Sequence, residues 1–511
     1  MKKWVNQGFH WFYRQRYNRF ERFAQHPRRV QLNVLNQLIE ATKHTEWGRK
    51  HDYKNIKTPE DFAQRVAVQD YESLKPYIER MMLGEKDILW SGRVTRYSKS
   101  SGTTNDRSKF IPISDQNLKK NHIRGTYDTM TSLYHLRPDA RQFECKTLLM
   151  GGSIESYERY PLTRRGDISA IMMDNMPWIA KPFFTPDFET ALMDDFEKKI
   201  ERMAEITSQE DLVMAGGVPT WTLVLFRKIL EITGKKNILE VWPNFQAYVH
   251  GGVSFTPYRE QFERYLPSKE VTYMEVYNAS EGFFAVQTDL ATEDMLLLLD
   301  NGVYYEFLPM SEWDKENPKA IPLWEVETGK DYAMLISTNG GLWRYNIGDT
   351  VSFTSTKPYK IKITGRTKQF VNAFGEEVMV DNTDAAIAKT CRQTGASVLD
   401  YTVAPIYLKG RSKGGHEWLI EFGDRPRDIE EFATLLDNNL QEINSDYAAK
   451  RYRNMALTRL RLRALPRNTF DNWMRSKGKY GGQSKVPRLS NNRKVVEEIL
   501  DFFGGERVFI F

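Results

Sequence analysis

The chain has 511 residues, of which 41% are hydrophobic and 13% aromatic. This apolar content is ample for burial and the length favours two or three domains, so the composition excludes a disordered protein. The 73 basic and 67 acidic side chains nearly cancel and leave a net charge of +6. So small an excess suits an anionic small molecule as well as a polyanion, and it gives no argument for nucleic acid.

Two cysteines, Cys145 and Cys391, lie far apart in the sequence. They provide neither a disulfide framework nor a zinc-binding spacing, which is typical of a reducing compartment. No apolar run approaches the ~20 residues that span a bilayer, and the N-terminus lacks the apolar segment and cleavage site of a secretory signal. We therefore expect a cytoplasmic protein with no membrane insertion.

Helices are predicted before and after a Ser/Thr-rich motif at residues 100–104. Residues 4–46 combine aromatic residues and arginines at helical spacing. Such a helix could lie on a membrane surface, but its broadly distributed apolar residues favour packing on the domain, with the arginine stems covering apolar surface. Residues 61–90 predict two short helices separated by a turn at Leu74-Lys75-Pro76, and residues 116–136 predict a longer helix that starts near Ser114.

The motif between these helices is Ser100-Ser101-Gly102-Thr103-Thr104, with Lys109 five residues after the last threonine. β-Forming residues flank it, which predicts a strand–loop–strand or strand–loop–helix unit. Its N–H groups and hydroxyls could cradle phosphate oxygens, with Lys109 as a mobile cation beside them. The spacing is not that of a Walker loop, and a solvated Ser/Thr-rich turn is the alternative.

Apolar strands that end in glycine turns recur at residues 145–152, 211–221 and 242–253. This repetition predicts an α/β layer architecture. In the third segment His250 precedes Gly251, Gly252 and Val253, where a flat ligand could approach the backbone closely. His250 could serve as a general base, although a histidine beside a glycine turn is more often structural.

Two further strand ends carry polar groups, at Tyr277-Asn278-Ala279-Ser280-Glu281 and at Tyr345-Asn346-Ile347-Gly348-Asp349. Tyr277 could offer its face to a base, and Glu281, at a strand mouth rather than buried, suits Mg²⁺. Asp349 could accept hydrogen bonds from both hydroxyls of a ribose. Alternatively, Tyr277 is a half-buried strand residue, Glu281 is a solvated carboxylate, and Asp349 belongs to a hairpin turn.

A short basic turn at Gly365-Arg366 between apolar strands is typical of a hinge that enters a new domain. Beyond it, helices at residues 383–394 and 429–444 and strands at residues 401–408 and 418–422 predict a small α+β domain. Its glycine-rich basic loop, residues 478–488, could carry Lys485 out of its own domain. A solvated basic loop is the alternative.

In this order the segments 100–104, 277–281, 345–349 and 482–488 resemble the adenylate-forming superfamily. More narrowly, the chain resembles the Gretchen Hagen-type (auxin-responsive promoter) acyl-acid amido synthetases in their bacterial form, and segments 216–221 and 250–255 extend the similarity over essentially the whole chain. The resemblance implies an α/β fold: a large N-terminal adenylate-forming domain with mixed sheets and helical layers, residues 1–366, and a small mobile C-terminal α+β lid domain, residues 367–511.

The resemblance also implies the site residues. Those expected to bind the nucleotide are Ser100, Ser101, Gly102, Thr103, Thr104, Lys109, Gly251, Gly252, Val253, Tyr277, Asn278, Ala279, Ser280, Tyr345, Asp349 and Arg366. Within this set the first loop would hold the β- and γ-phosphates, the glycine pair and Tyr277 would sandwich adenine, and Asp349 would grip the ribose. Glu281 would hold Mg²⁺ and Lys485 would bridge the substrate carboxylate and the α-phosphate, which makes these two the catalytic residues.

The implied reaction activates a small-molecule carboxylic acid with ATP and Mg²⁺ as an acyl-AMP, releases pyrophosphate, and transfers the acyl group to the amine of an amino acid. The alternatives are transfer to CoA or a carrier thiol, and a non-catalytic nucleotide-binding protein. The sequence assigns no acyl pocket and no oligomeric state. His122, Arg124 and Tyr127, in the helix after the phosphate loop, are candidate neighbours of the acyl group.

Overall fold

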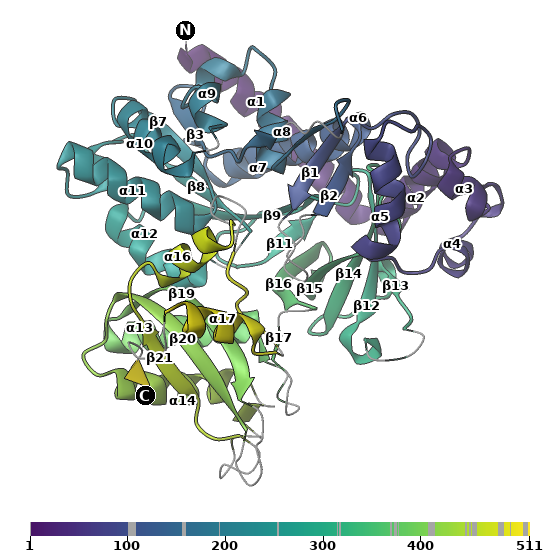
Figure 1. Cartoon of the computed structure of the whole chain (residues 1–511). Coiled ribbons are helices and arrows are strands. Elements are labelled where there is room, and N and C mark those ends of the chain that lie inside the picture. The colour runs from purple at the N-terminus through teal and green to yellow at the C-terminus, as the bar shows by residue number, and fades with distance from the viewer. Residues whose placement is uncertain are drawn as a thin grey trace. The chain divides into compact units, whose positions relative to one another are not determined.

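The computed structural model describes residues 2–100, 109–155, 160–193, 195–252, 255–313, 315, 318–367, 370–371, 376, 378–406, 414–444, 447–448, 451, 457–478, 485–490, 492–503 and 509–510 (Figure 1). The chain divides into two compact units. Unit 1 contains Met1–Gly252 and Tyr265–Lys362, and unit 2 contains Val253–Arg264 and Ile363–Phe511. A short piece from the middle of the sequence thus belongs to the C-terminal unit.

The main sheet has the strand order β13-β12-β14-β15-β16-β11-β10-β9-β8-β7-β3-β6. Its strands are β3 (Lys146–Leu149), β6 (Phe184–Thr185), β7 (Leu212–Gly217), β8 (Ala247–His250), β9 (Thr272–Ala279), β10 (Gly282–Gln287), β11 (Met295–Leu297), β12 (Val303–Pro309), β13 (Ile321–Pro322), β14 (Asp331–Thr338), β15 (Tyr345–Thr356) and β16 (Tyr359–Arg366). Strands β6, β3, β7, β8 and β9 pair in parallel, and antiparallel pairs follow from β9 onward. The predicted α/β layer architecture corresponds to the parallel part of this sheet. Its strands include continuous apolar runs that are buried, such as that of β7.

A smaller sheet has the order β2-β1-β5-β4. It consists of β1 (Arg96–Ser100), β2 (Lys109–Ile113), β4 (Ile154–Glu155) and β5 (Arg164–Gly166). Strands β1 and β2 are antiparallel and Ser100 faces Lys109 at their open end. The predicted phosphate motif is therefore of the strand–loop–strand kind, and its loop, residues 101–108, lies outside the described residues.

The helices of unit 1 surround these sheets (Figure 1). They are α1 (Lys2–Gln25), α2 (Pro27–Thr42), α3 (Glu46–Lys50), α4 (Pro59–Arg65), α5 (Tyr71–Met82), α6 (Asp115–Asn117), the π-helical turn η2 (Leu118–His122), α7 (Ile123–Leu136), α8 (Ile168–Asp174), α9 (Phe188–Ala191), α10 (Phe196–Thr207) and α11 (Pro219–Thr233). No helix in the described part of the chain is both long and apolar enough to cross a membrane.

Helix α1 packs on the domain, as its pattern predicts. Tyr13 and Phe20 are buried, and Arg19 bonds the carboxylates of Asp128, on α7, and Asp300. The opposite face of α1 keeps Trp4 80% exposed. The arginines of this helix therefore serve in part as internal partners for carboxylates.

The turn predicted at Leu74-Lys75-Pro76 is wrong, because α5 continues through Pro76. A capping box between Asp70 and Ser73 fixes the start of the helix, and its apolar side chains, such as Ile78, are buried. Pro76 is the sixth residue of this helix and removes one intrahelical bond, the one its N–H would have donated to the carbonyl of Glu72. Burial and capping therefore outweigh the local turn signal.

Unit 2 is built on a sheet of order β19-β20-β21-β22. Its elements are η5 (Thr256–Tyr258), α12 (Arg259–Tyr265, of which Tyr265 belongs to unit 1), β17 (Phe370–Val371), β18 (Val378–Met379), α13 (Val380–Thr394), β19 (Ser397–Ile406), β20 (Gly415–Asp424), α14 (Ile429–Ile443), β21 (Arg461–Leu465), α16 (Thr469–Ser476), α17 (Lys494–Phe502) and β22 (Phe509–Ile510). The predicted small α+β domain has this arrangement.

Side chains alternate between two cores across this sheet. Val403 and Trp418 pack in a first core with residues of α13 and α14, whereas Ala404 and Leu419 pack in a second core with residues of α16 and α17. Successive strand residues point to opposite faces. The two helix pairs therefore cover opposite faces of the sheet.

Candidate active site

The glycine pair after β8 lies beside β9. In the parallel register of these strands His250 faces Glu275. A Cβ at Gly251 would stand 2.5 Å from the carbonyl oxygen of Val276, and Gly252 has a φ of +79°. Both positions therefore require glycine, one for close approach and one for a left-handed backbone. The residue before them, His250, is buried and stacked on Tyr248 at 5.8 Å, which agrees with a structural role.

Tyr277 and Asp349, predicted to contact the nucleotide from two distant strands, meet in the structure. The Tyr277 hydroxyl donates a hydrogen bond of 2.6 Å to the Asp349 carboxylate, and both residues are 4% exposed. Tyr277 stands one residue beyond Val276, against which Gly251 packs. The glycine turn, the aromatic ring and the carboxylate thus occupy one region of unit 1.

A β-bulge sets the position of Asp349. On β14 the step from Ala333 to Leu335 faces the longer step from Thr350 to Asn346 on β15. Gly348 within the bulge has a φ of +87°, and its N–H donates to the Asn346 side chain at 2.9 Å. Bulges of this kind redirect side chains beside functional sites, and here the bulge sets the direction of Asp349 toward Tyr277.

Tyr345 is buried at the start of β15. The residue before it, Arg344, was not among the candidates predicted from the sequence. Arg344 has a left-handed backbone, with φ +43°, and its guanidinium forms a buried ion pair with Glu306 at 2.9 Å. Burial raises the pKa of Glu306, and Arg344 opposes that shift. A strained residue held by a buried pair is typical of segments that must be rigid. No local sequence pattern marks such a pair, since 38 residues separate its members.

Glu281 occupies the tight turn between β9 and β10, where Ala279 faces Gly282. Its expected position outside the buried region is wrong, because only 7% of it is exposed. The π-helical turn η2 packs against the strand after this turn: the Asn121 side chain accepts from the N–H of Phe283 at 2.7 Å and donates to its carbonyl at 3.2 Å. Tertiary packing of this kind leaves no trace in the local sequence. Asn278 and Ser280 lie on the same hairpin.

Lys109 lies at the start of β2 with its Nζ 5.8 Å from the centre of the Tyr71 ring. The N–H of the next residue, Phe110, donates to the Tyr71 hydroxyl at 2.9 Å. The base of the phosphate motif is therefore anchored on α5. Ser101, Gly102, Thr103, Thr104 and Val253 lie outside the described residues, as do the side chains of Ser100 and Arg366.

Lys485 is exposed and directly precedes a segment fixed on unit 2, in which Val486 is buried. The remaining candidates lie in unit 1. His122 is buried, and burial lowers its pKa to about 3, so the imidazole is neutral. Arg124 bonds the Asp300 carboxylate at 2.7 Å, and Tyr127 is 40% exposed.

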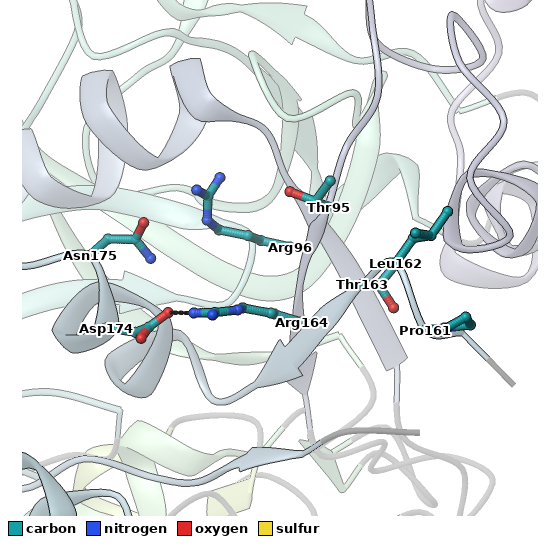
Figure 2. Close-up of a pocket in the computed structure, with 8 residues that line it drawn as sticks. All are labelled: Thr95, Arg96, Pro161, Leu162, Thr163, Arg164, Asp174 and Asn175. Atoms are coloured by element: carbon teal, nitrogen blue, oxygen red, sulfur yellow. Dashed lines mark hydrogen bonds and ion pairs between the residues drawn. The ribbon is translucent and has the colours of Figure 1, made fainter. Parts of the chain in front are cut away.

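A surface pocket of about 260 Å³ lies elsewhere, between β1 and the segment around β5 (Figure 2). Its two arginines point in similar directions, but each has a carboxylate partner: Arg96 pairs with Asp115 at 2.5 Å and Arg164 pairs with Asp174. None of the nucleotide-binding candidates that the structure describes lines it. This pocket is therefore distinct from the candidate site.

No group of three or more His, Cys, Asp or Glu side chains among the described residues could hold a metal ion by itself. Mg²⁺ in nucleotide sites needs only one or two carboxylates, because phosphate oxygens and water complete its coordination. A single carboxylate at the end of β9, that of Glu281, is compatible with this mode of binding.

Comparison with known proteins shows which proteins this chain resembles in sequence and fold. The chain is 22% identical to the indole-3-acetic acid-amido synthetase GH3.3 of Arabidopsis thaliana over 92% of this chain and 90% of that protein. The solved structure of the AtGH3.15 acyl acid amido synthetase in complex with 2,4-DB superposes with a TM-score of 0.77, at 16% identity and 95% coverage of both chains. A 2-hydroxyisobutyryl-CoA ligase in the postadenylation state gives 0.60, at 12% identity and coverage of 93% and 92%.

The fold is thus that of the adenylate-forming enzymes, and the class is that of the ATP-dependent acid–amino acid ligases, which form acyl-adenylates. Family profiles agree over most of the length: the GH3 family N-terminal domain matches residues 16–159 and 161–271, the central domain residues 296–366 and the C-terminal domain residues 381–494. The chain belongs to the GH3 family.

Proposed function

We propose that this ligase activates a small-molecule carboxylic acid as its acyl-adenylate and transfers the acyl group to the amine of an amino acid. The substrate carboxylate attacks the α-phosphorus of ATP, and the bond to the β-phosphate breaks as pyrophosphate departs with its electron pair. The amine then attacks the acyl carbon, loses a proton and displaces AMP.

In this proposal Asp349 accepts from the ribose hydroxyls, Tyr277 and the glycine pair Gly251–Gly252 flank the adenine, and the loop between Ser100 and Lys109 holds the phosphates. Arg366 assists at the ribose or a phosphate. Lys485 neutralises the charge that develops when two anions, a carboxylate and a phosphate, come together. A point cation suits this role better than a planar guanidinium.

Glu281 would hold Mg²⁺, which supplies electrostatic stabilisation to the phosphate oxygens when bound. We also propose a functional boundary at residue 366, between an adenylate-forming domain of residues 1–366 and a lid of residues 367–511. The family's central-domain match ends at that residue. A cytoplasmic location is proposed from the two free cysteines.

The observation that carries the proposal is the buried bond between Tyr277 and Asp349 beside Gly251. Two strands that are distant in sequence bring an aromatic ring and a carboxylate to the glycine turn. These are the groups that a nucleoside requires, a flat apolar face and an acceptor for two hydroxyls.

Carboxylate-dependent exchange between ATP and pyrophosphate tests the first step, because a protein that only binds nucleotide shows none. Lys485→Ala should lower exchange by about 10²–10³-fold while ATP still binds. Lys477→Ala is the matched control, since Lys477 is a surface lysine of the same unit, paired with Glu498. Normal exchange in Lys485→Ala would remove the role assigned to this lysine.

Two further measurements separate the alternatives. Glu281→Ala should raise the Mg²⁺ concentration required for exchange, whereas Glu293→Ala, at a carboxylate 66% exposed in the same unit, should leave it unchanged. An unchanged titration in Glu281→Ala would argue against Glu281 as the ligand. Mass spectrometry of products formed with amino acids or with CoA decides the second step, and a thioester product would refute the amide.

A further inference from the structure

The segment that follows Lys485 is fixed on β19. The N–H of Val403 donates to the carbonyl of Arg488 at 2.8 Å, and the N–H of Ser490 donates to the carbonyl of Val403 at 3.1 Å. The Thr402 hydroxyl donates to the carbonyl of Pro487 at 2.6 Å. Residues 487–490 therefore run along β19 as a short added strand with one parallel bridge, between Leu489 and Val403, and Lys485 lies two residues before it.

The Arg488 side chain reinforces this strand. Its guanidinium donates to the Asp400 carboxylate and, at 2.7 Å, to the Tyr258 hydroxyl. It also lies 4.4 Å over the ring of Tyr401. Only 14% of this side chain is exposed. The planar fork of arginine meets two acceptors and a ring together, which the ammonium group of lysine cannot do.

Tyr258, one of these acceptors, comes from a different part of the chain. It is 2% exposed and lies six residues after Gly252, in the segment Val253–Arg264 that belongs to unit 2. The same segment bonds β20 through Arg264, which donates to Asp424 at 2.9 Å. Arg488 thus joins the base of the lysine loop to the chain that leaves the glycine turn.

We propose that Arg488 is a positioning residue for Lys485. It acts by fixing the short strand that begins two residues after the lysine, and so it limits the positions that the Lys485 ammonium can reach. The inference rests on the proposed function of Lys485. Misplacing a catalytic group by about 1 Å can cost on the order of 10²-fold in rate, so a loosened strand should lower the rate of adenylation rather than the affinity for ATP.

The test uses carboxylate-dependent exchange by the full chain. Arg488→Lys, which keeps the charge but loses the fork, should lower kcat by about 10–100-fold with the KM for ATP within about twofold. Tyr258→Phe, which removes one acceptor and keeps the ring, should lower kcat severalfold. Arg493→Lys is the matched control: Arg493 contacts the Pro405 carbonyl and Glu417 on the same sheet, and its kcat should not change.

A second comparison separates positioning from a general loss of stability. In a Lys485→Ala background, Arg488→Lys should cause no further loss of residual exchange, because residues that act as a unit are non-additive. Two outcomes would overturn the inference: a further loss of the same size in the Lys485→Ala background, or a normal kcat in both Arg488→Lys and Tyr258→Phe. If Lys485→Ala itself has lost exchange, either outcome overturns only the inference and leaves the proposed function of Lys485 standing. If the wild-type chain shows no exchange, the proposed function fails and the inference falls with it.

Discussion

The substitution Tyr277→Phe isolates the bond on which the candidate site depends. It removes one oxygen, keeps the ring that would stack on adenine, and leaves the Asp349 carboxylate, 4% exposed, without its 2.6 Å donor. A hydrogen bond to a charged group contributes about 1.5–3 kcal/mol. Because about 1.4 kcal/mol corresponds to a factor of ten, we expect the KM for ATP in the exchange assay to rise by about tenfold or more.

Tyr305→Phe is the matched control. The Tyr305 hydroxyl is also buried in unit 1, but it donates to a backbone carbonyl, that of Leu298, at 3.1 Å. Both variants should lower the melting temperature, and only Tyr277→Phe should change the KM for ATP. An unchanged KM in folded Tyr277→Phe, or an equal rise in both variants, would refute the reasoning that Asp349 is oriented for the ribose by this tyrosine.

Three further predictions concern stability. Glu306→Gln leaves the buried Arg344 guanidinium with the carbonyls of Ala63 and Val66 but without its counter-charge, and should cost about 3–5 kcal/mol of unfolding free energy in denaturant titration. Burial raises the pKa of Glu421 to about 7, so the folded state binds this proton more tightly than the unfolded state does. The resulting stabilisation is complete below pH ~4.5 and is lost as the pH rises through ~7, by up to ~3 kcal/mol. Glu421→Gln should flatten this part of the profile of melting temperature against pH. Gly125→Ala sets a Cβ 2.1 Å from the Phe283 ring and should cost about 1–3 kcal/mol in the same titration.

Each of these three stability predictions has a control variant of the same chain or an outcome that would contradict it. Glu293→Gln breaks an exposed pair with Lys362 and should change the unfolding free energy by less than about 1 kcal/mol. Gly8→Ala, where a Cβ would meet nothing within 4 Å in α1, should stabilise by about 0.5–1 kcal/mol. A loss in Glu306→Gln no larger than in Glu293→Gln, a profile unchanged by Glu421→Gln, or equal effects at the two glycines would contradict the respective argument.

The sequence predicted those features that depend on local periodicity and turn chemistry. The strands on both sides of the phosphate motif are present, and the glycine requirement after β8 follows from close backbone approach. The helices of the C-terminal domain also lie near their predicted ranges: the predicted 429–444 is α14, Ile429–Ile443. Each of these signals lies within one short window of sequence.

What the sequence did not predict depends on tertiary contacts. The resemblance placed Tyr277 and Asp349 at one nucleotide, but the direct bond between them, across 72 residues, depends on a bulge whose register no local pattern specifies. The burial of Glu281, which is 7% exposed, and the packing of Asn121 on Phe283 two residues further on have no local sequence signal. The continuation of α5 through Pro76 was missed because burial and capping decided it. In each case the decisive partner is distant in sequence.

The membership of Val253–Arg264 in unit 2 has a practical consequence for dissecting this protein. A C-terminal fragment cut at the predicted hinge would lack Tyr258 and the helix that bears Arg264, and would expose the surfaces that they cover. An N-terminal fragment would retain Phe255 and Phe262, which are buried in the intact chain. The segment that carries them would then lack the rest of unit 2, against which it packs. The two units are interleaved along the polypeptide, so a cut at the hinge should leave both pieces less stable than they are in the intact chain.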